Sequence, residues 1–294
     1  MLELRTDAAN RILTEAEAQQ ALRDQPIGVF DSGVGGLTVV REIMRQIPEE
    51  RLVYFGDTAR VPYGSKSRDT VIYYSKQITR FLLTKNVKAI VIACNTATSF
   101  ALEELEKELD IPVIGVVRPG AKVASLATEN HRIGVIATQG TVESGIYKEY
   151  IQNLNPSLQV YEKACPLLVS LVEEMWLHDP ITTQIVERYL EEMKKFDVDT
   201  LVLGCTHFPL LRSTIRSVMG PGVNLVNPAY ETAVELRRIL EWKDLLRGED
   251  KELKPGEYKY EFYVSDTPGR LQTFASSILP YEVEHIEKIK IEEY

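Results

Sequence analysis

Two cysteines, Cys94 and Cys205, each end an apolar run that is nearly duplicated in the other half of the chain. The segments VKAIVIACNTATSF and VDTLVLGCTHFPLL both predict a buried strand that places a cysteine at its carboxyl end. In open α/β sheets, ligands bind in the crevice outside the carboxyl ends of the strands. If the two half-sites face each other, one thiolate and one thiol flank a small substrate from opposite sides. Such a pair could remove a weakly acidic hydrogen from one face of a carbon and return a proton to the other.

Two ionisable residues accompany these thiols. An unperturbed cysteine, with a pKa of ~8.5, is only a few per cent thiolate at pH 7, so a neighbour must assist its deprotonation. His207 follows Cys205 by two residues in GCTHF, and Asp31 ends an apolar run at the glycine-rich turn DSGVGG. Each could serve its nearest thiol as a proton acceptor or charge partner. The alternatives stay open: a hydrogen-bonded structural histidine for His207, and a helix N-cap or turn residue for Asp31.

Neutral hydrogen-bond donors surround the same positions. DSGVGGLT lacks the Lys-Ser/Thr ending of a phosphate loop, but its glycines allow a tight strand-to-helix turn whose N–H groups and Ser32 hydroxyl face an anion such as a carboxylate. VPYGSKS at residues 61–67 predicts another turn with backbone donors. Asn95, Thr96 and Thr206 directly follow the two cysteines, where substrate carboxylate or ammonium groups would lie.

The other cysteine and the other histidines carry less chemistry. Cys165 precedes a proline at a predicted helix start and has no counterpart in the repeat, which favours a packing role. We expect no metal, because the residues that could be gathered for zinc lack the close ligand pairs typical of structural sites: Cys94, Cys165, Cys205 and His207. Three histidines in charged or loop contexts are expected at the surface: His131, His178 and His285.

The repeat also extends upstream of the cysteines. IGVFDSGVGG from Ile27 precedes the first copy and IGVIATQGTV from Ile133 precedes the second, in the same order and at similar separations. Apolar runs of strand length alternate with segments of helix length, which is typical of βαβ units. Strands are expected at 27–30, 52–55, 89–93, 113–116, 133–136, 160–162, 200–203, 224–226 and 258–264. Helices are expected at 36–46, 67–86, 97–109, 120–128, 142–153, 166–176, 180–196 and 210–218, with one more after residue 229.

We therefore predict an α/β fold of two similar domains, each a mostly parallel sheet flanked by helices, with the active site in the cleft between them. Residues 1–24 are an extension that contains a loose amphipathic helix, with Leu2, Ile12, Leu13, Ala16 and Leu22 as its apolar positions. The first domain is expected at 25–117 plus 229–294 and the second at 118–228. The tail is assigned to the first domain because a lone helix and strand cannot make a core of their own.

Composition excludes several classes of protein. Lys+Arg number 34 and Asp+Glu number 43, so the net charge of −9 argues against nucleic acid or an anionic membrane as a partner. No run of 18 apolar residues predicts a transmembrane helix, and the charged start does not read as a signal peptide. With only three cysteines among 294 residues, we expect a reduced, cytoplasmic protein.

Four motifs in register, DSGVGGLTV, PYG, ACNTA and GCTHFPLL, resemble the glutamate racemases of the aspartate/glutamate racemase superfamily from about residue 27 to 233. This resemblance implies a PLP-independent isomerase that interconverts L- and D-glutamate and supplies D-glutamate for peptidoglycan synthesis, hence for cell-wall biogenesis and cell shape. It implies glutamate as the small-molecule partner and no cofactor. We also expect a homodimer.

Carried over by position, the resemblance implies catalytic roles for Cys94, Cys205, Asp31, His207 and Glu173. It implies substrate contacts from Asp31, Ser32, Tyr63, Gly64, Asn95, Thr96, Thr138, Thr141, Thr206 and His207. Asn227, where many members carry Asp or Ser, is assigned no role. Some members with an extension before Pro26 are regulated by a cell-wall precursor, and the sequence does not decide this point here.

Two other functions stay open at this stage. One is an aspartate racemase or related dicarboxylate isomerase, although GCTH resembles the glutamate enzymes and the aspartate enzymes resemble GCTE. The other is a non-catalytic dicarboxylate-binding or thiol redox protein. The distance between the two sulfur atoms distinguishes these hypotheses. A disulfide indicates redox chemistry, and two free thiols across a pocket indicate racemisation.

Overall fold

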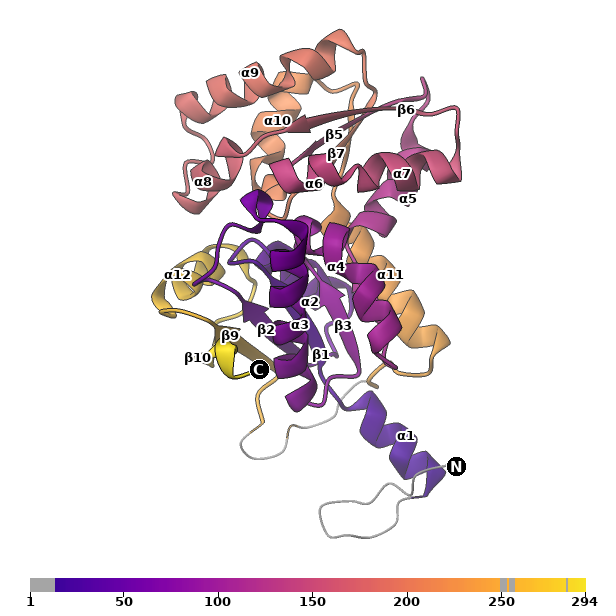
Figure 1. The fold of residues 1–294 in the computed structure, drawn as a ribbon, viewed down its shortest axis with the longest axis vertical. Helices are drawn as coiled ribbons and strands as arrows, with labels where there is room; N and C mark the ends of the chain where they lie inside the picture. Colours follow the sequence, from indigo (N-terminus) through magenta and orange to yellow (C-terminus); the bar gives the residue numbers. More distant parts are fainter. Residues whose placement is uncertain (1–13, 249–252, 254–256, 284) are drawn as a thin grey trace.

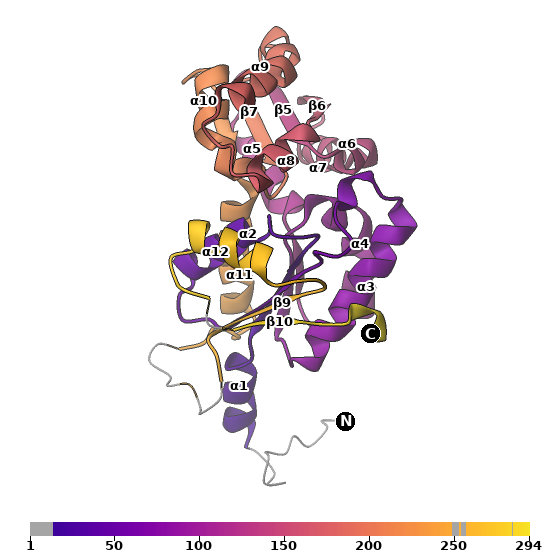
Figure 2. The ribbon, with the colours of Figure 1, turned by 90° about the vertical axis from the view of Figure 1, so that its left-hand side faces the viewer.

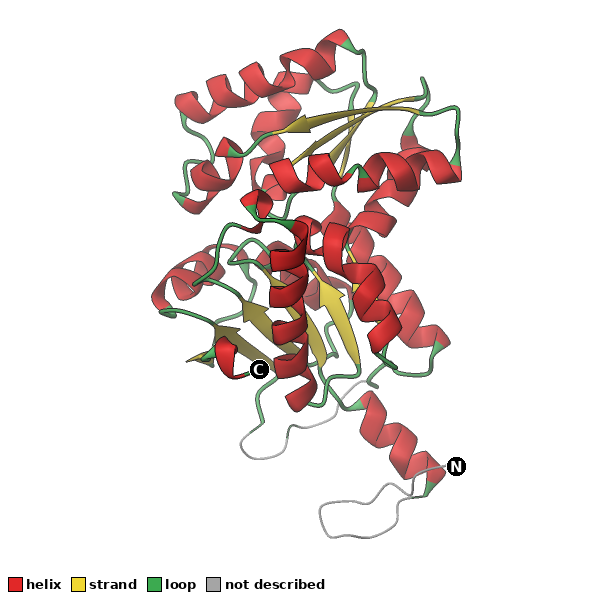
Figure 3. Cartoon of the chain, in the orientation of Figure 1, coloured by secondary structure: helices red, strands yellow, loops and turns green. Residues whose placement is uncertain are grey.

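The computed structural model describes residues 14–248, 253, 257–283 and 285–294, which form two parallel sheets with helices on their faces (Figures 1 and 3). The first sheet has the strand order β10-β9-β2-β1-β3-β4, and the second has the order β6-β5-β7-β8. Their strands are β1 (Ile27–Asp31), β2 (Leu52–Gly56), β3 (Ala89–Ile92), β4 (Val113–Gly115), β5 (Arg132–Ala137), β6 (Gln159–Ala164), β7 (Thr200–Gly204), β8 (Asn224–Val226), β9 (Tyr260–Val264) and β10 (Ile286–Lys288). The predicted α/β class is confirmed.

The internal repeat corresponds to a shared topology. The four strands β2-β1-β3-β4 and the four strands β6-β5-β7-β8 follow the same order, so each half contains the same arrangement. In the first, Ile27 of β1 pairs with Ala89 of β3, and in the second, Ile133 of β5 pairs with Thr200 of β7, both in parallel register. The strand that carries each cysteine therefore lies beside the strand that starts each repeat.

The helices are α1 (Glu15–Arg23), α2 (Leu37–Gln46), α3 (Arg68–Thr84), α4 (Asn95–Glu108), α5 (Val117–Ala127), α6 (Gln139–Ser144), α7 (Ile146–Leu154), α8 (Leu167–Glu173), α9 (Pro180–Lys195), α10 (Arg212–Met219), α11 (Pro228–Trp242) and α12 (Gly269–Ile278). Short 3₁₀ turns lie at η1 (Tyr63–Ser65), η2 (Phe208–Leu211) and η3 (Ile291–Glu293). The strands β1, β2, β3 and β7 are buried along their whole length, as parallel strands with helices on both faces require, whereas the edge strands β6 and β10 are partly exposed.

Several predicted helix bounds were wrong, and two of these errors have a local cause. The single helix expected at 142–153 is two helices, because Gly145 adopts a left-handed conformation with φ +65° between α6 and α7. The helix expected to run to residue 176 ends at Glu173, and Met175 has φ +59°. The helix expected from residue 97 begins at Asn95, directly after Cys94.

The tail returns to the first sheet, as predicted. β9 pairs with β2 in parallel, with Leu52 opposite Tyr260, and β10 extends the same edge. Neither α12 nor β10 was predicted from the sequence. β10 has only three residues, none of them fully buried, so its burial pattern lacks the alternation that marks a longer strand.

The chain passes between the sheets twice, from β4 into α5 and from β8 into α11 (Figure 2). Pro119 and Gly120 lie inside the first turns of α5, where proline is tolerated. From the sequence they were expected to mark the boundary between the domains. The predicted bounds at residues 117 and 229 lie close to these crossings and stay a prediction. Among the described helices, none has the length and apolar character needed to cross a membrane.

Helix α1 projects below the first sheet and is attached at its carboxyl end (Figure 1). Thr14 and Glu17 form a reciprocal capping box at its start, and it buries none of its residues. Ala16 and Leu22 of the predicted helix lie in α1, while Leu2, Ile12 and Leu13 fall outside the described residues. The Lys88 ammonium, beside β3, donates to the carbonyl oxygens of Arg23 and Leu245, so it joins this helix and the end of α11 to the sheet.

Lys88 also forms an ion pair with Glu50, at 2.6 Å and with both side chains fully inaccessible. Removing one partner of a buried pair leaves the other charge uncompensated, so Lys88→Met should lower the free energy of unfolding by about 3–5 kcal/mol. The measurement is urea denaturation followed by circular dichroism. Lys195→Met, which removes an exposed pair with Glu191, is the matched control and should change stability little. Equal effects of the two substitutions would contradict the assignment.

Candidate functional site

A small pocket, with a cavity volume of about 30 Å³, lies at the carboxyl ends of strands from both sheets. Residues that follow the ends of β1, β3, β5 and β7 line this pocket, at the points where each strand leads into a turn or helix. Its lining residues are Ser32, Pro62, Tyr63, Gly64, Cys94, Asn95, Thr96, Thr138, Val169, Cys205, Thr206 and His207. Most of the predicted site residues are therefore brought together, including both cysteines.

Cys94 caps the amino terminus of α4. Its sulfur accepts the backbone N–H of Ala97 at 3.4 Å and lies 3.7 Å from the hydroxyl oxygen of Ser32. Burial raises the pKa of the Cys94 thiol to about 12, and the negative charge of Asp31 acts in the same direction. The contacts with Ala97 and Ser32 lower this pKa without offsetting burial. At neutral pH the ligand-free molecule therefore carries Cys94 as the thiol.

Cys205 begins a chain of polar contacts on the other side of the pocket. Its sulfur lies 3.7 Å from His207 Nδ1, and His207 Nε2 lies 3.0 Å from Glu173 Oε1. Burial by itself lowers the pKa of His207, but the hydrogen bonds with Cys205 and Glu173 raise it to about 10. The imidazole is then protonated at neutral pH and can donate toward the sulfur from Nδ1 and to Glu173 from Nε2.

Asp31 lies beneath the pocket and joins the two halves. It is fully buried, accepts the backbone N–H of Gly33 at 3.0 Å, and accepts the hydroxyl of Thr206 at 3.4 Å. Desolvation by burial raises the pKa of its carboxyl group. Thr38 of α2 donates to the carbonyl oxygen of Thr206 at 2.8 Å, so the segment after Cys205 is held by the first half on two sides.

Hydroxyl groups make a second connection between the halves. Thr96 Oγ1 lies 2.9 Å from Thr138 Oγ1 and 3.2 Å from Thr141 Oγ1, and the last two lie 3.0 Å apart. Asn95 Oδ1 accepts the buried hydroxyl of Tyr147 at 2.7 Å. A Cβ on Gly64 would approach Thr138 to 2.7 Å, so only glycine permits this close contact between η1 and α6.

Three predicted site residues lie outside the lining. Asp31 and Thr141 are fully buried behind it, and Glu173 reaches the pocket only through His207. The sequence analysis missed Pro62 and Val169, which line the pocket, and Arg270, whose guanidinium lies 2.9 Å from Glu173 Oε2. Pro62 lies in the PYG motif beside the predicted residues Tyr63 and Gly64, whereas Val169 within a helix and Arg270 in the tail belong to no motif that could have marked them.

The residues given structural roles lie away from the pocket or behind it. Cys165 is fully buried in the core, as a packing role requires, and Asn227 accepts the backbone N–H of Ala229 as the cap of α11. His131 and His178 are exposed, as predicted, and His285 is intermediate in exposure. All three cysteines are free thiols. Within the described part of the chain, no cluster of three or more His, Cys, Asp or Glu side chains is suited to hold a metal ion.

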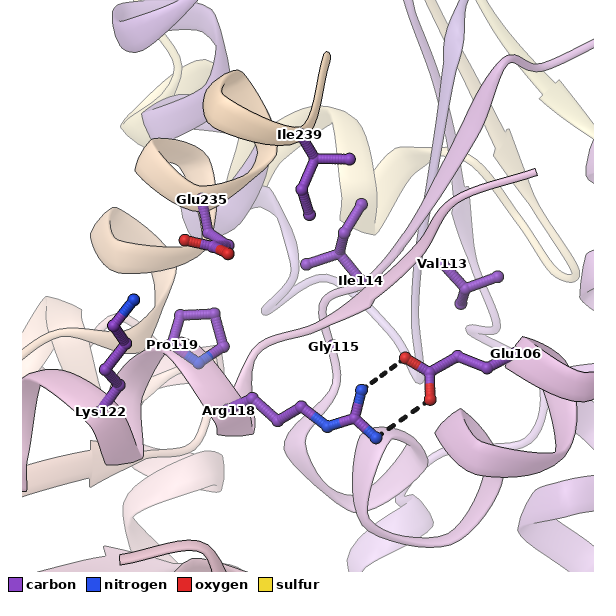
Figure 4. Close-up of a pocket in the computed structure, with 9 residues that line it drawn as sticks. All are labelled: Glu106, Val113, Ile114, Gly115, Arg118, Pro119, Lys122, Glu235 and Ile239. Carbon is purple, nitrogen blue, oxygen red and sulfur yellow. Dashed lines mark hydrogen bonds and ion pairs between the residues drawn. The ribbon is translucent and has the colours of Figure 1, made fainter. Parts of the chain in front are cut away.

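A second pocket lies where the chain first passes between the sheets (Figure 4). Arg118 at the start of α5 pairs with Glu106 of α4, its Nη2 atom 3.0 Å from Glu106 Oε2, and Figure 4 shows the two side chains facing each other. Arg118 also donates to the Tyr150 hydroxyl of α7 at 3.1 Å. This pocket contains none of the predicted site residues.

Comparisons with known proteins agree with this geometry. Residues 27–236 match the family described as Asp/Glu/Hydantoin racemase. A glutamate racemase of Geobacter metallireducens is 44% identical over 266 residues, which cover 90% of this chain and 97% of that protein. The crystal structure of the glutamate racemase isoform RacE1 from Bacillus anthracis has a TM-score of 0.85 at 39% identity, with 91% and 98% of the two chains covered. The glutamate racemase of Francisella tularensis, solved in complex with D-glutamate, has a TM-score of 0.84 at 36% identity, with coverage of 92% and 100%.

The influence of Asp31 on Cys94 can be measured without any substrate. Because the negative charge of Asp31 raises the pKa of Cys94, Asp31→Asn should lower that pKa and speed alkylation by iodoacetamide about three- to tenfold at pH 8. Mass spectrometry of the peptide that contains Cys94 gives the rate. Asp199→Asn, at the opposite end of β7, is the control and should leave the rate unchanged. An unaltered rate in Asp31→Asn would show that the two groups are not coupled.

Proposed function

Because this chain belongs to the Asp/Glu/Hydantoin racemase family, we propose that it is a cofactor-independent glutamate racemase that interconverts L- and D-glutamate. The observation that carries the proposal is the placement of Cys94 and Cys205, two free thiols from different sheets, in the lining of one pocket. The D-glutamate that it forms would supply peptidoglycan synthesis in the cytoplasm, and so cell-wall biogenesis and cell shape.

In the proposed mechanism, one cysteine removes the α-hydrogen as a thiolate while the other, as a thiol, protonates the opposite face. Each turnover exchanges the protonation states of the two sulfurs, so the reverse direction uses the same groups in exchanged roles. His207 and Glu173 assist Cys205 through the observed chain of contacts. Asp31 assists on the Cys94 side, where its charge opposes formation of the thiolate and so favours its return to the thiol.

Substrate recognition is assigned to neutral donors. Among the described residues that line the pocket, none is lysine or arginine. Backbone N–H groups at the starts of helices and neutral side chains can hold carboxylates by their dipoles. We assign these contacts to Ser32, Tyr63, Gly64, Asn95, Thr96 and Thr206, with Thr138 and Thr141 closing the same side and Asp31 and His207 completing the set.

We also propose a homodimer, which light scattering coupled to size-exclusion chromatography tests directly. An aspartate racemase and a non-catalytic binding protein are the competing functions. The free thiols favour catalysis over a structural disulfide.

Substrate and mechanism are tested together by incubation with L-glutamate in deuterated water. We expect loss of optical rotation with entry of deuterium at the α-carbon, because the proton returned to the opposite face comes from a thiol that exchanges with solvent. L-Aspartate should react far more slowly. Faster racemisation of aspartate would support the alternative substrate, and binding without deuterium entry would support the non-catalytic protein.

Removal of either thiol should abolish racemisation. Cys94→Ala and Cys205→Ala each leave one face of the substrate without a proton-transfer group, and no other thiol lines the pocket among the described residues. Turnover is measured by circular dichroism of glutamate in both directions. Cys165→Ala, a buried thiol outside the lining, is the control and should retain activity. Near-native turnover in either Cys94→Ala or Cys205→Ala would refute the two-base mechanism.

A further inference from the structure

Helix α12 belongs to the first half of the molecule, yet it contacts Glu173 and His207 of the second half. Leu271, Phe274 and Ala275 are buried, and α12 packs near α2 (Figure 2). A Cβ on Gly56, at the end of β2, would lie 3.4 Å from Leu271, which shows how closely the helix follows the first sheet. The packing of α12 therefore fixes its position relative to the first sheet.

Two residues of α12 face the Cys205 side of the pocket. Arg270 and Phe274 are four residues apart and so lie on one face of the helix. The Arg270 Nη2 atom lies 2.9 Å from Glu173 Oε2, and the ring of Phe274 lies 6.5 Å from the ring of His207 between centroids. Glu173 is the last residue of α8 and His207 follows β7, both in the second half, so these contacts cross between the halves.

The two oxygens of Glu173 have separate partners. Oε1 faces His207 Nε2 and Oε2 faces Arg270, so the guanidinium fixes the plane of the carboxylate and leaves one oxygen for the imidazole. The Glu173 side chain is 17% exposed and that of Arg270 is 54% exposed, which places the arginine at the rim. The other ionisable groups that face His207 are Cys205 and Asp31.

We propose that Arg270 is a positioning residue for the Cys205 side of the site: from the first half it holds Glu173 in the orientation that accepts the His207 N–H. The pair joins the two halves, so Arg270 links their packing against each other to the arrangement of His207. The catalytic meaning of this inference rests on the proposed racemase function, but the contact itself does not.

Two roles for Arg270 predict opposite shifts. If Arg270 acted only through its charge, its removal would favour the imidazolium and raise the pKa of His207 above about 10. If it positions Glu173, its removal frees the carboxylate to turn toward water. The hydrogen bond with Glu173, which together with the one to Cys205 raises the pKa of His207, is then weakened, and this pKa falls.

The first measurement is an NMR titration of the histidine ring nitrogens in the full-length, substrate-free protein, with the His207 signals identified by their loss in His207→Gln. We expect Arg270→Gln to lower the pKa of His207 and Arg270→Lys, which keeps the charge, to give an intermediate value. Lys288→Gln is the control, because Lys288 forms a comparable exposed pair with Asp266 in the same tail. A raised or unchanged pKa in Arg270→Gln would overturn the proposal, whether or not the wild-type protein racemises glutamate.

The second measurement is steady-state kinetics in both directions. Exposed ion pairs contribute little free energy, so Arg270→Gln should lower kcat/KM by only about two- to fivefold. The equilibrium ratio of the enantiomers is one, so both directions must lose the same factor. The loss should lie in kcat more than in KM, and Lys288→Gln should match the wild type. An effect on KM alone would reject positioning of His207, and an inactive wild type would reject the proposed function without altering the titration result.

Discussion

The carboxyl ends of two parallel sheets face each other, and the rest of the structure depends on this constraint. A parallel strand cannot return by a hairpin, so each strand ends in a turn that begins a helix, with free N–H groups at the edge of the sheet. The polar residues of the two halves meet at this edge. Thr206 contacts Asp31 there, and Thr96 contacts Thr138, so the seam between the halves and the wall of the pocket are made of the same side chains.

The two thiols have different charged neighbours, although the segments that carry them are nearly the same in sequence. Cys94 lies at the amino terminus of α4 with a buried carboxylate nearby, and its pKa rises to about 12. Cys205 has a protonated imidazole as its neighbour instead. A racemase needs one proton donor and one acceptor at any moment, so an asymmetric environment is compatible with a symmetric reaction. The substrate contributes its own charges when it enters, and these complete the electrostatics of the pocket.

The tail of the chain both extends the first sheet and contributes to the rim of the pocket. β9 extends the first sheet beside β2, which brings α12 next to α2 and to the rim of the pocket. Because α12 follows β9, its residue Arg270 reaches Glu173 in the other half. Lys88 performs a comparable task at the opposite end of the first sheet, where its ammonium joins α1 and the end of α11 to the edge of β3.

The sequence by itself determined the α/β class, the positions of the described strands other than β10, and the two cysteines at strand ends, because alternating apolar runs and local motifs extend over only a few residues. It also marked Asp31 and His207, which stand next to those strands. Only the tertiary structure decided that Asp31 contacts Thr206, that Glu173 reaches the pocket through His207, and that Arg270 joins them from the tail. Such contacts join positions far apart in the chain and depend on how two sheets pack, which no local pattern records. The break at Gly145 was also decided in three dimensions, since a helix pattern of 142–153 does not show where the backbone turns left-handed.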